Sequence, residues 1–128
     1  LLPPIKLDVT DEGWSAFCLN RDFILLVNLL HLVSESEAKV IICGISKSLA
    51  PGGRCVIYGP FMRNGFLTSD GDRFFHQSLT EADPDIGYKD DTWILDLFKN
   101  YKLETVKIAD MPANNLGFVI EKNHLKPS

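Results

Sequence analysis

The chain has 128 residues, a length typical of one domain. Hydrophobic residues make up 45% of it and charged residues 23%, which allows a packed core and excludes a wholly disordered chain. Thirteen basic and seventeen acidic residues give a formal charge of −4, which argues against a protein that binds nucleic acid through its phosphates.

Two strands and a helix are predicted in the first part of the chain. Residues 5–9 alternate apolar and polar side chains, as a short strand does. Residues 23–27 form a continuous, largely branched apolar run, which is typical of a parallel strand covered on both faces. Ser34 and Glu37 form an S-x-x-E capping box, so we expect a helix that begins there and ends at Pro51-Gly52-Gly53.

The other predicted elements continue this alternation. Residues 55–58 predict a further buried strand, and residues 61–72 predict a long loop. The remaining elements are a helical turn over residues 14–19, helices over residues 74–82 and 90–101, and strands over residues 103–109 and 116–120, joined by a turn at 111–115.

The order of the elements predicts the sheet. Strand–helix–strand units imply a parallel sheet with right-handed crossovers. The last two strands are joined by about five residues and must be antiparallel, because a parallel connection needs a dozen or more. We therefore expect an α/β three-layer sandwich whose mostly parallel sheet has one antiparallel strand near its edge.

Polar side chains follow the predicted strands, at the sheet edge where open α/β proteins bind ligands. Asp8 ends the first strand, Asn28 ends the second with His31 just after it, and Tyr58 ends the third. Two alternatives remain open. Asn28 is also suited to capping the segment that follows. His31 is also suited to a partly solvated position at the start of a helix.

Several segments resemble a known protein superfamily. Residues 21–31 and the Leu49-Ala-Pro-Gly-Gly53 turn resemble the fourth and fifth strands of class I S-adenosylmethionine-dependent methyltransferases. The segments Tyr58-Gly59-Pro60-Phe61 and Met111-Pro112-Ala113-Asn114-Asn115 resemble more narrowly the methyltransferase-like 26 family, and the resemblance extends over essentially the whole chain.

The resemblance implies a Rossmann-like methyltransferase fold with strand order 3-2-1-4-5-7-6 and an antiparallel seventh strand. Residues 1–128 would form a single domain that contains strands three to seven. The implied activity is methyl transfer from S-adenosylmethionine to a small-molecule or protein acceptor that the sequence does not identify.

The resemblance also suggests roles for individual residues. Asp8, with Val9 beside it, matches the position that contacts the adenine side of the cofactor. Asn28 matches a position near the sulfonium and the acceptor, and His31 is placed to act as a general base. The acceptor pocket would be lined by Tyr58, Phe61, Asn114 and Asn115, for which core packing (the aromatic residues) and turn formation (the asparagines) are the alternatives. No metal site is expected.

One departure from the superfamily pattern affects the expected function. The Gly-rich loop after strand one and the carboxylate that ends strand two have no counterpart in the sequence. We therefore expect an N-terminally truncated domain with impaired or absent activity. The alternative is a non-catalytic isoform or relative that binds proteins through an exposed sheet edge, where a homodimer is also expected.

Cysteine usage and hydropathy indicate a compartment. Cys18, Cys43 and Cys55 form no C-x-x-C pair, which fits reduced thiols and argues against a zinc site. No signal peptide opens the chain, and its longest apolar run is much shorter than the roughly 20 residues that span a bilayer. These features predict a protein of the cytoplasm, with the nucleus as an alternative.

Overall fold

The computed structural model describes residues 9–10, 13–17 and 19–123. The predicted strand at residues 5–9 lies outside the described residues except for Val9, which is in a turn. The described elements, in chain order, are the 3-10 helix η1 (Trp14–Phe17), strand β1 (Arg21–Val27), 3-10 helix η2 (Leu30–Leu32), helix α1 (Glu35–Ser48), strand β2 (Leu49–Pro60), helices α2 (Asp70–Ala82) and α3 (Asp91–Asn100), strand β3 (Leu103–Met111), 3-10 helix η3 (Pro112–Asn114) and strand β4 (Asn115–Lys122).

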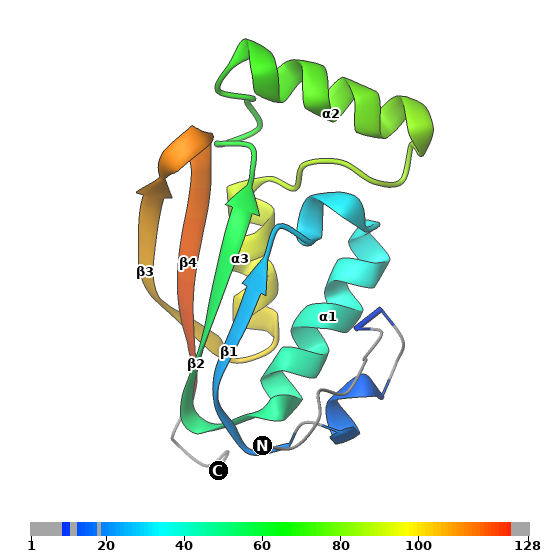
Figure 1. The fold of residues 1–128 in the computed structure, drawn as a ribbon. Coiled ribbons are helices and arrows are strands. Elements are labelled where there is room, and N and C mark those ends of the chain that lie inside the picture. The colour runs from blue at the N-terminus through cyan, green and yellow to red at the C-terminus, as the bar shows by residue number, and fades with distance from the viewer. Residues whose placement is uncertain (1–8, 11–12, 18, 124–128) are drawn as a thin grey trace, which may run out of the picture.

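Four strands form one sheet in the order β1-β2-β4-β3 (Figure 1). β1 pairs with β2 in parallel, and β4 pairs in antiparallel fashion with both β2 and β3. Three strands therefore point the same way and β4 alone points the other way. This arrangement confirms the predicted α/β fold, and it matches the 4-5-7-6 part of the strand order that the resemblance implies.

Helix α1 begins where its capping box predicts. The Ser34 Oγ accepts a hydrogen bond from the Glu37 N–H over 3.1 Å, and the Glu37 Oε1 accepts one from the Ser34 N–H over 3.0 Å. Both bonds satisfy donors that a helix N-terminus leaves without an intrahelical partner.

The boundary between α1 and β2 differs from the prediction. β2 begins at Leu49, directly after the helix, so the Pro51-Gly52-Gly53 segment lies inside the strand and not in a turn before it. A backbone angle and a close contact explain this. Gly52 has a φ of 81°, which favours glycine, and a Cβ on Gly53 would lie 2.8 Å from the Arg21 carbonyl oxygen. The glycines permit an irregular, close pairing with β1, whose register shifts between Arg21 and Phe23.

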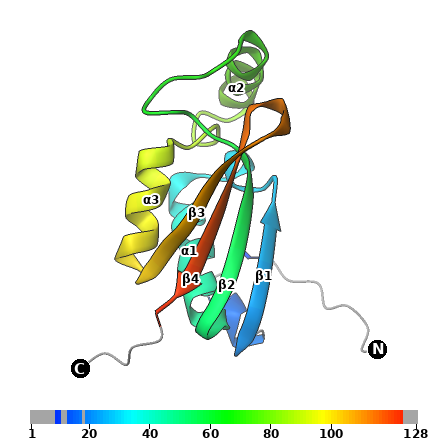
Figure 2. The same ribbon diagram turned by 90° about the vertical axis from the view of Figure 1, so that its left-hand side faces the viewer.

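The core lies between the sheet and the helices α1 and α3, which pack together against one sheet face (Figure 2). Alternate residues of β2 and β4 point into it. The largest fully buried side chains among the described residues are those of Ile41, Ile42, Ile45, Leu49, Ile57, Ile94, Phe98, Leu103, Phe118 and Ile120. The opposite sheet face carries exposed apolar side chains on β1. The described residues thus form two of the layers of an α/β sandwich, the sheet and one layer of helices.

Helix α2 lies apart from this core, beyond the carboxyl ends of β1 and β2 (Figure 1). It begins at Asp70, four residues before its predicted start, because the Ser69 side chain caps it by accepting a hydrogen bond from the Asp72 N–H. None of its residues is buried. The loop predicted over residues 61–72 is therefore shorter, and α2 stands over the edge at which a ligand site is expected.

The hairpin between β3 and β4 confirms the predicted turn. Ala113 and Asn114 have φ values of 60° and 61°, in the left-handed region that asparagine tolerates better than most residues. None of the helices in the described part of the chain is long and apolar enough to cross a membrane.

Candidate functional site

Asn28 directly follows β1, at the carboxyl edge of the sheet. Its backbone N–H donates to the Tyr58 carbonyl oxygen over 2.8 Å, and its φ is 54°. The residue that caps η2 is Leu29, which makes no side-chain capping bond, so Asn28 is not that cap. The side chain of Asn28 is exposed. Its Oδ1 lies 3.7 Å from the point where a Cβ on Gly59 would be, so glycine keeps the neighbouring strand end open beside it.

His31 lies in η2 and is only 6% exposed. Its ring packs edge-on against Phe75 of α2 and against Tyr88, with centroids 5.6 and 6.2 Å away. Its Nδ1 is buried and has no hydrogen-bond partner among the described residues. Burial lowers the pKa of His31, and the positive charge of Lys89 lowers it further. The alternative of a partly solvated histidine is therefore wrong.

Lys89 is a buried cation that the sequence does not mark as special. Its Nζ donates to the carbonyl oxygens of Val33 and Gly87 over 2.6 and 2.8 Å. Burial lowers the pKa of Lys89, whereas the carboxylates of Glu35 and Glu37 act to raise it. The sequence does not predict this contact, because Lys89 and Val33 are 56 residues apart.

A second group of contacts attaches α2 to the loop before α3. The Tyr88 hydroxyl donates to the Asp72 Oδ1 over 2.7 Å, and the Tyr88 N–H donates to the His76 Nδ1 over 3.0 Å. Burial raises the pKa of Tyr88. The hydrogen bond to Asp72 and the negative charge of Asp72 raise it further. Gly87 has a φ of 135°, and a Cβ there would lie 2.8 Å from the His76 ring. His31, α2 and this loop therefore form one packed unit.

A pocket of about 420 Å³ opens beside this unit, between α2 and the start of α3. Glu35, His76, Asp85, Asp90 and Trp93 are among the residues that line it. His31 does not line it. Asp90 also caps α3 by accepting a hydrogen bond from the Thr92 N–H over 3.2 Å, which is the structural role that its position in the sequence predicts.

The four residues predicted to line the acceptor pocket divide into two kinds. The Asn115 Nδ2 donates to the Tyr58 hydroxyl over 3.0 Å, so these two side chains do meet. Phe61 is 3% exposed and packs edge-on against Phe118 in the core. Asn114 is exposed in the hairpin, and its carbonyl oxygen accepts a hydrogen bond from Arg63. Phe61 therefore has the position in the core, and Asn114 the position in a turn, that were the alternatives to lining the acceptor pocket.

Arg63 is a further residue that sequence reasoning missed. Its two terminal nitrogens donate to the carbonyl oxygens of Phe61 over 2.7 Å and of Asn114 over 2.9 Å. It thereby ties the segment after β2 to the β3–β4 hairpin. Of the two residues matched to the adenine side of the cofactor, Asp8 lies outside the described residues and Val9 packs half-buried against the core.

Comparison with known proteins places this geometry in context. A family model described as "Protein of unknown function (DUF938)" matches residues 1–122. Among solved structures, an O-methyltransferase family protein from Burkholderia thailandensis is similar, with a TM-score of 0.78 at 14% identity over 95% of this chain and 36% of that chain. An O-methyltransferase family 2 protein from Planctomyces limnophilus, solved with apigenin, gives 0.72 at 17% identity over 80% and 31%. Human N-acetylserotonin methyltransferase, solved with S-adenosylmethionine, gives 0.67 at 14% identity over 80% and 29%.

These TM-scores, at identities of 14–17%, show a shared fold. The chain spans about a third of the length of the solved structures that it matches. Its four strands and the helices that cover them thus have a methyltransferase-like, Rossmann-like fold.

Proposed function

The chain belongs to the DUF938 family, and we propose that it forms part of an S-adenosylmethionine-dependent methyltransferase domain, in which residues 1–128 contribute strands three to seven. Within that superfamily we retain the methyltransferase-like 26 family as the nearest resemblance, on the strength of the Tyr58–Phe61 and 111–115 segments. The methyl acceptor, a small molecule or a protein, would lie beneath α2.

The observation that supports this proposal is the position of Asn28 and His31. Both follow β1 at the carboxyl edge of a sheet whose order and directions are those of the methyltransferase fold. In open α/β sheets this edge is where ligands bind. Helix α2 stands over the same edge and contacts His31 through Phe75, so the edge is also partly shielded from water.

The residues at this edge fit one side of the cofactor. S-adenosylmethionine supplies an activated methyl group when it is bound. The exposed amide of Asn28, which makes no capping bond, is available to hold the cofactor there, and Gly59 leaves room beside it. Asp8, and Val9 next to it, remain the proposed contacts on the adenine side. Tyr58 and Asn115, joined by their hydrogen bond, are the proposed polar wall of the acceptor pocket.

His31 is the proposed proton acceptor. Because burial and the charge of Lys89 lower its pKa, the imidazole is neutral at pH 7 and able to take a proton. Its Nδ1 has no partner among the described residues, and an unpaired buried nitrogen costs about 1–3 kcal/mol. His31 does not line the neighbouring pocket and its ring lies against Phe75 of α2, so an acceptor reaches this nitrogen only when α2 moves aside. A hydroxyl or amino group on the acceptor would then donate a hydrogen bond to the nitrogen and remove that cost.

Calorimetric titration with S-adenosylhomocysteine tests the cofactor part of the proposal. We expect saturable binding that weakens in Asn28→Gly, a change that removes the amide and still allows a φ of 54°. Asn20→Gly is the matched control, because Asn20 is also exposed with a positive φ, 59°, but precedes β1 at its opposite end. Absence of binding, or equal weakening by both changes, would contradict the proposal.

A second candidate function rests on the open face of the sheet. Phe23, Leu25 and Val27 of β1 are 59%, 58% and 49% exposed, and β1 is also an edge strand of the described sheet. Exposed apolar patches and free strand edges are typical of association sites. A non-catalytic protein that binds partners here, or pairs with a second copy of itself, is the alternative to an active or impaired methyltransferase. For either function we propose the cytoplasm or the nucleus as the location.

A further inference from the structure

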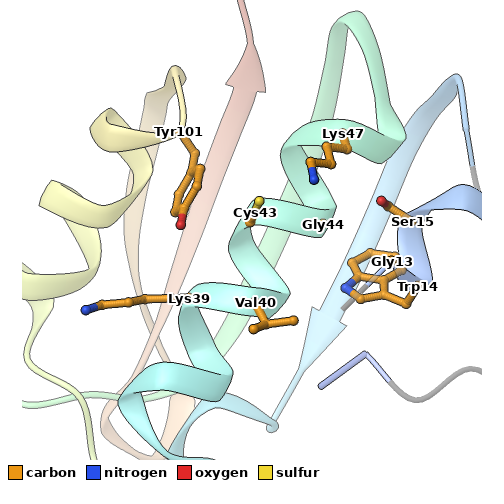
Figure 3. Close-up of a pocket in the computed structure, with 9 residues that line it drawn as sticks. All are labelled: Gly13, Trp14, Ser15, Lys39, Val40, Cys43, Gly44, Lys47 and Tyr101. Carbon is orange, nitrogen blue, oxygen red and sulfur yellow. The ribbon is translucent and has the colours of Figure 1, made fainter. Parts of the chain in front are cut away.

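A second pocket, of about 290 Å³, lies away from the carboxyl edge, over the outer side of α1 (Figure 3). It is lined by Gly13 and residues of η1, by residues of α1, and by Tyr101, which follows the last residue of α3. Lys39, Cys43 and Lys47 of α1 are spaced four residues apart, so they lie in a row on one helix face. No contact described above uses these three side chains.

One wall of this pocket is a tryptophan held tightly against α1. Trp14 is 7% exposed, and its indole ring lies so close to Gly44 that a Cβ at position 44 would be 2.2 Å from the ring. Val40 lines the pocket one turn earlier, and Tyr101 is the lining residue from the end of α3. Figure 3 shows Trp14 and Tyr101 to either side of the α1 face that carries Cys43. The pocket therefore combines an aromatic surface with an aliphatic one.

The charges around the pocket have one sign. Among the described residues that line it, two are lysines and none is an aspartate or glutamate. Neither Lys39 nor Lys47 has a carboxylate within ion-pair distance in the described part of the chain, where the ion pairs found all involve arginines. Two uncompensated ammonium groups beside an apolar wall, in a chain with a net charge of −4, attract a negative charge to this place.

We propose that this pocket binds a small organic anion with a flat apolar body. Lys39 and Lys47, eight residues apart on α1, provide the positive potential that attracts its acidic group, and Trp14 and Val40 contact its body. Pockets for drug-sized ligands begin at roughly 300 Å³, so the volume suits a ligand of about one ring. Aromatic carboxylates have this chemistry. The proposal uses no residue of the carboxyl edge and does not depend on the methyltransferase function.

Cys43 provides a direct readout of occupancy. Its thiol is half-buried and lines the pocket between the two lysines. Cys55 is fully buried, and burial raises its pKa to about 12, so it reacts slowly at neutral pH. In a Cys18→Ser background, the rate of alkylation by iodoacetamide, followed by intact-protein mass spectrometry, therefore reports the accessibility of Cys43.

Benzoate and its neutral isostere benzamide are the probes. We expect benzoate to slow alkylation of Cys43 by about tenfold at ten times its dissociation constant, and benzamide to protect far less. If benzoate gives no protection, the pocket does not bind such anions and the proposal is overturned. Equal protection by benzamide would overturn the assignment of the lysines.

The variant Lys39→Gln/Lys47→Gln tests the lysines separately. Both side chains are exposed, so the fold should be retained. The rate with benzoate, divided by the rate without it, should rise from about one tenth in the wild type to about one. The control is Lys99→Gln/Lys102→Gln, which removes two exposed lysines that do not line this pocket. Protection that survives in the first variant, or disappears equally in the second, would contradict the proposal.

Discussion

The Tyr88 hydroxyl donates a hydrogen bond to the Asp72 carboxylate over 2.7 Å, which joins the loop before α3 to the first turn of α2. α2 has no buried residue, so its position depends on a few specific contacts and not on a large apolar interface. Segments with few buried apolar contacts open at low free-energy cost. The Tyr88–Asp72 pair is therefore a main determinant of whether the carboxyl edge is covered.

Tyr88→Phe should loosen α2. The change removes one hydrogen bond to a charged group, which at a partly exposed site contributes about 1 kcal/mol. Amide hydrogen exchange should become faster across α2 and remain unchanged in β2 and β4. Tyr101→Phe is the control, since it removes a phenolic hydroxyl at the other end of the molecule. Unchanged exchange in α2 would show that this pair does not hold the helix.

Acid should have a related effect through Asp72. Burial acts to raise its pKa, but hydrogen bonds from Tyr88, Ser69 and Thr68 outweigh it and hold the pKa below the ordinary value of 3.8. The lowered pKa means that the stabilisation is present above pH 3.8 and is lost as the pH falls through the value in the folded state. Protection factors of the α2 amides, which allow for the slowing of intrinsic exchange in acid, should decrease over that range, and less steeply in Tyr88→Phe, where one of the causes is gone.

His31 should make stability depend on pH nearer to neutrality. Burial, then the charge of Lys89, lowers its pKa below 6.5. The unfolded chain therefore binds a proton that the folded chain excludes, so stability is present above pH 6.5 and decreases as the pH falls through the lowered value.

We expect the free energy of unfolding in urea to decrease from pH 7 to pH 5, and to decrease less in His31→Leu. His76→Gln serves as a comparison, because the pKa of His76 is also lowered by burial and by Lys89. The side-chain amide oxygen of the introduced glutamine can still accept a hydrogen bond from the Tyr88 N–H. If His31→Leu keeps the whole pH dependence, the burial of His31 is not its source.

Much of the fold could be predicted because its causes are local. The Ser34–Glu37 capping box places the start of α1, and the short connection at residues 111–115 requires β3 and β4 to be antiparallel. The strand boundary at Leu49 could not be predicted in this way. It depends on the close approach of Gly53 to Arg21, a contact between strands that helix-stop rules do not describe.

The candidate site was predicted in part. Asn28 and His31 both follow β1 at the carboxyl edge of the sheet, as the order of the elements predicted, and their roles in binding and catalysis stay predictions. The burial of His31 could not be inferred, because it results from Phe75 and Tyr88, both distant in sequence. Lys89 and Arg63 were missed for the same reason, since each acts by binding distant backbone carbonyls.

Leu25→Glu should reduce self-association if the open sheet face is used for it. The side chain is 58% exposed in the centre of β1, so the charge should cost little stability within one chain. In contact with a second apolar surface, the charge would be costly to bury. Sedimentation velocity over a concentration series measures the effect. Asn100→Asp, which adds the same charge at the end of α3, should leave association unchanged. A wild-type chain that is monomeric at every concentration would contradict the homodimer.

Gly44→Ala should destabilise the protein, although alanine is normally the better residue inside a helix by about 1 kcal/mol. The added Cβ would lie 2.2 Å from the Trp14 ring, so the ring must leave its place on α1. In a Trp93→Phe background, fluorescence of Trp14 should shift to longer wavelength and the unfolding midpoint in urea should fall.

Gly71→Ala in α2 is the matched control, because the nearest atom to its Cβ would be the Ser69 Oγ at 3.8 Å, an ordinary contact. That change should leave Trp14 unaffected and the midpoint unchanged or higher. Stabilisation by Gly44→Ala with an unshifted spectrum would mean that Trp14 does not rest on this glycine, and the pocket beside it would lose its aromatic wall.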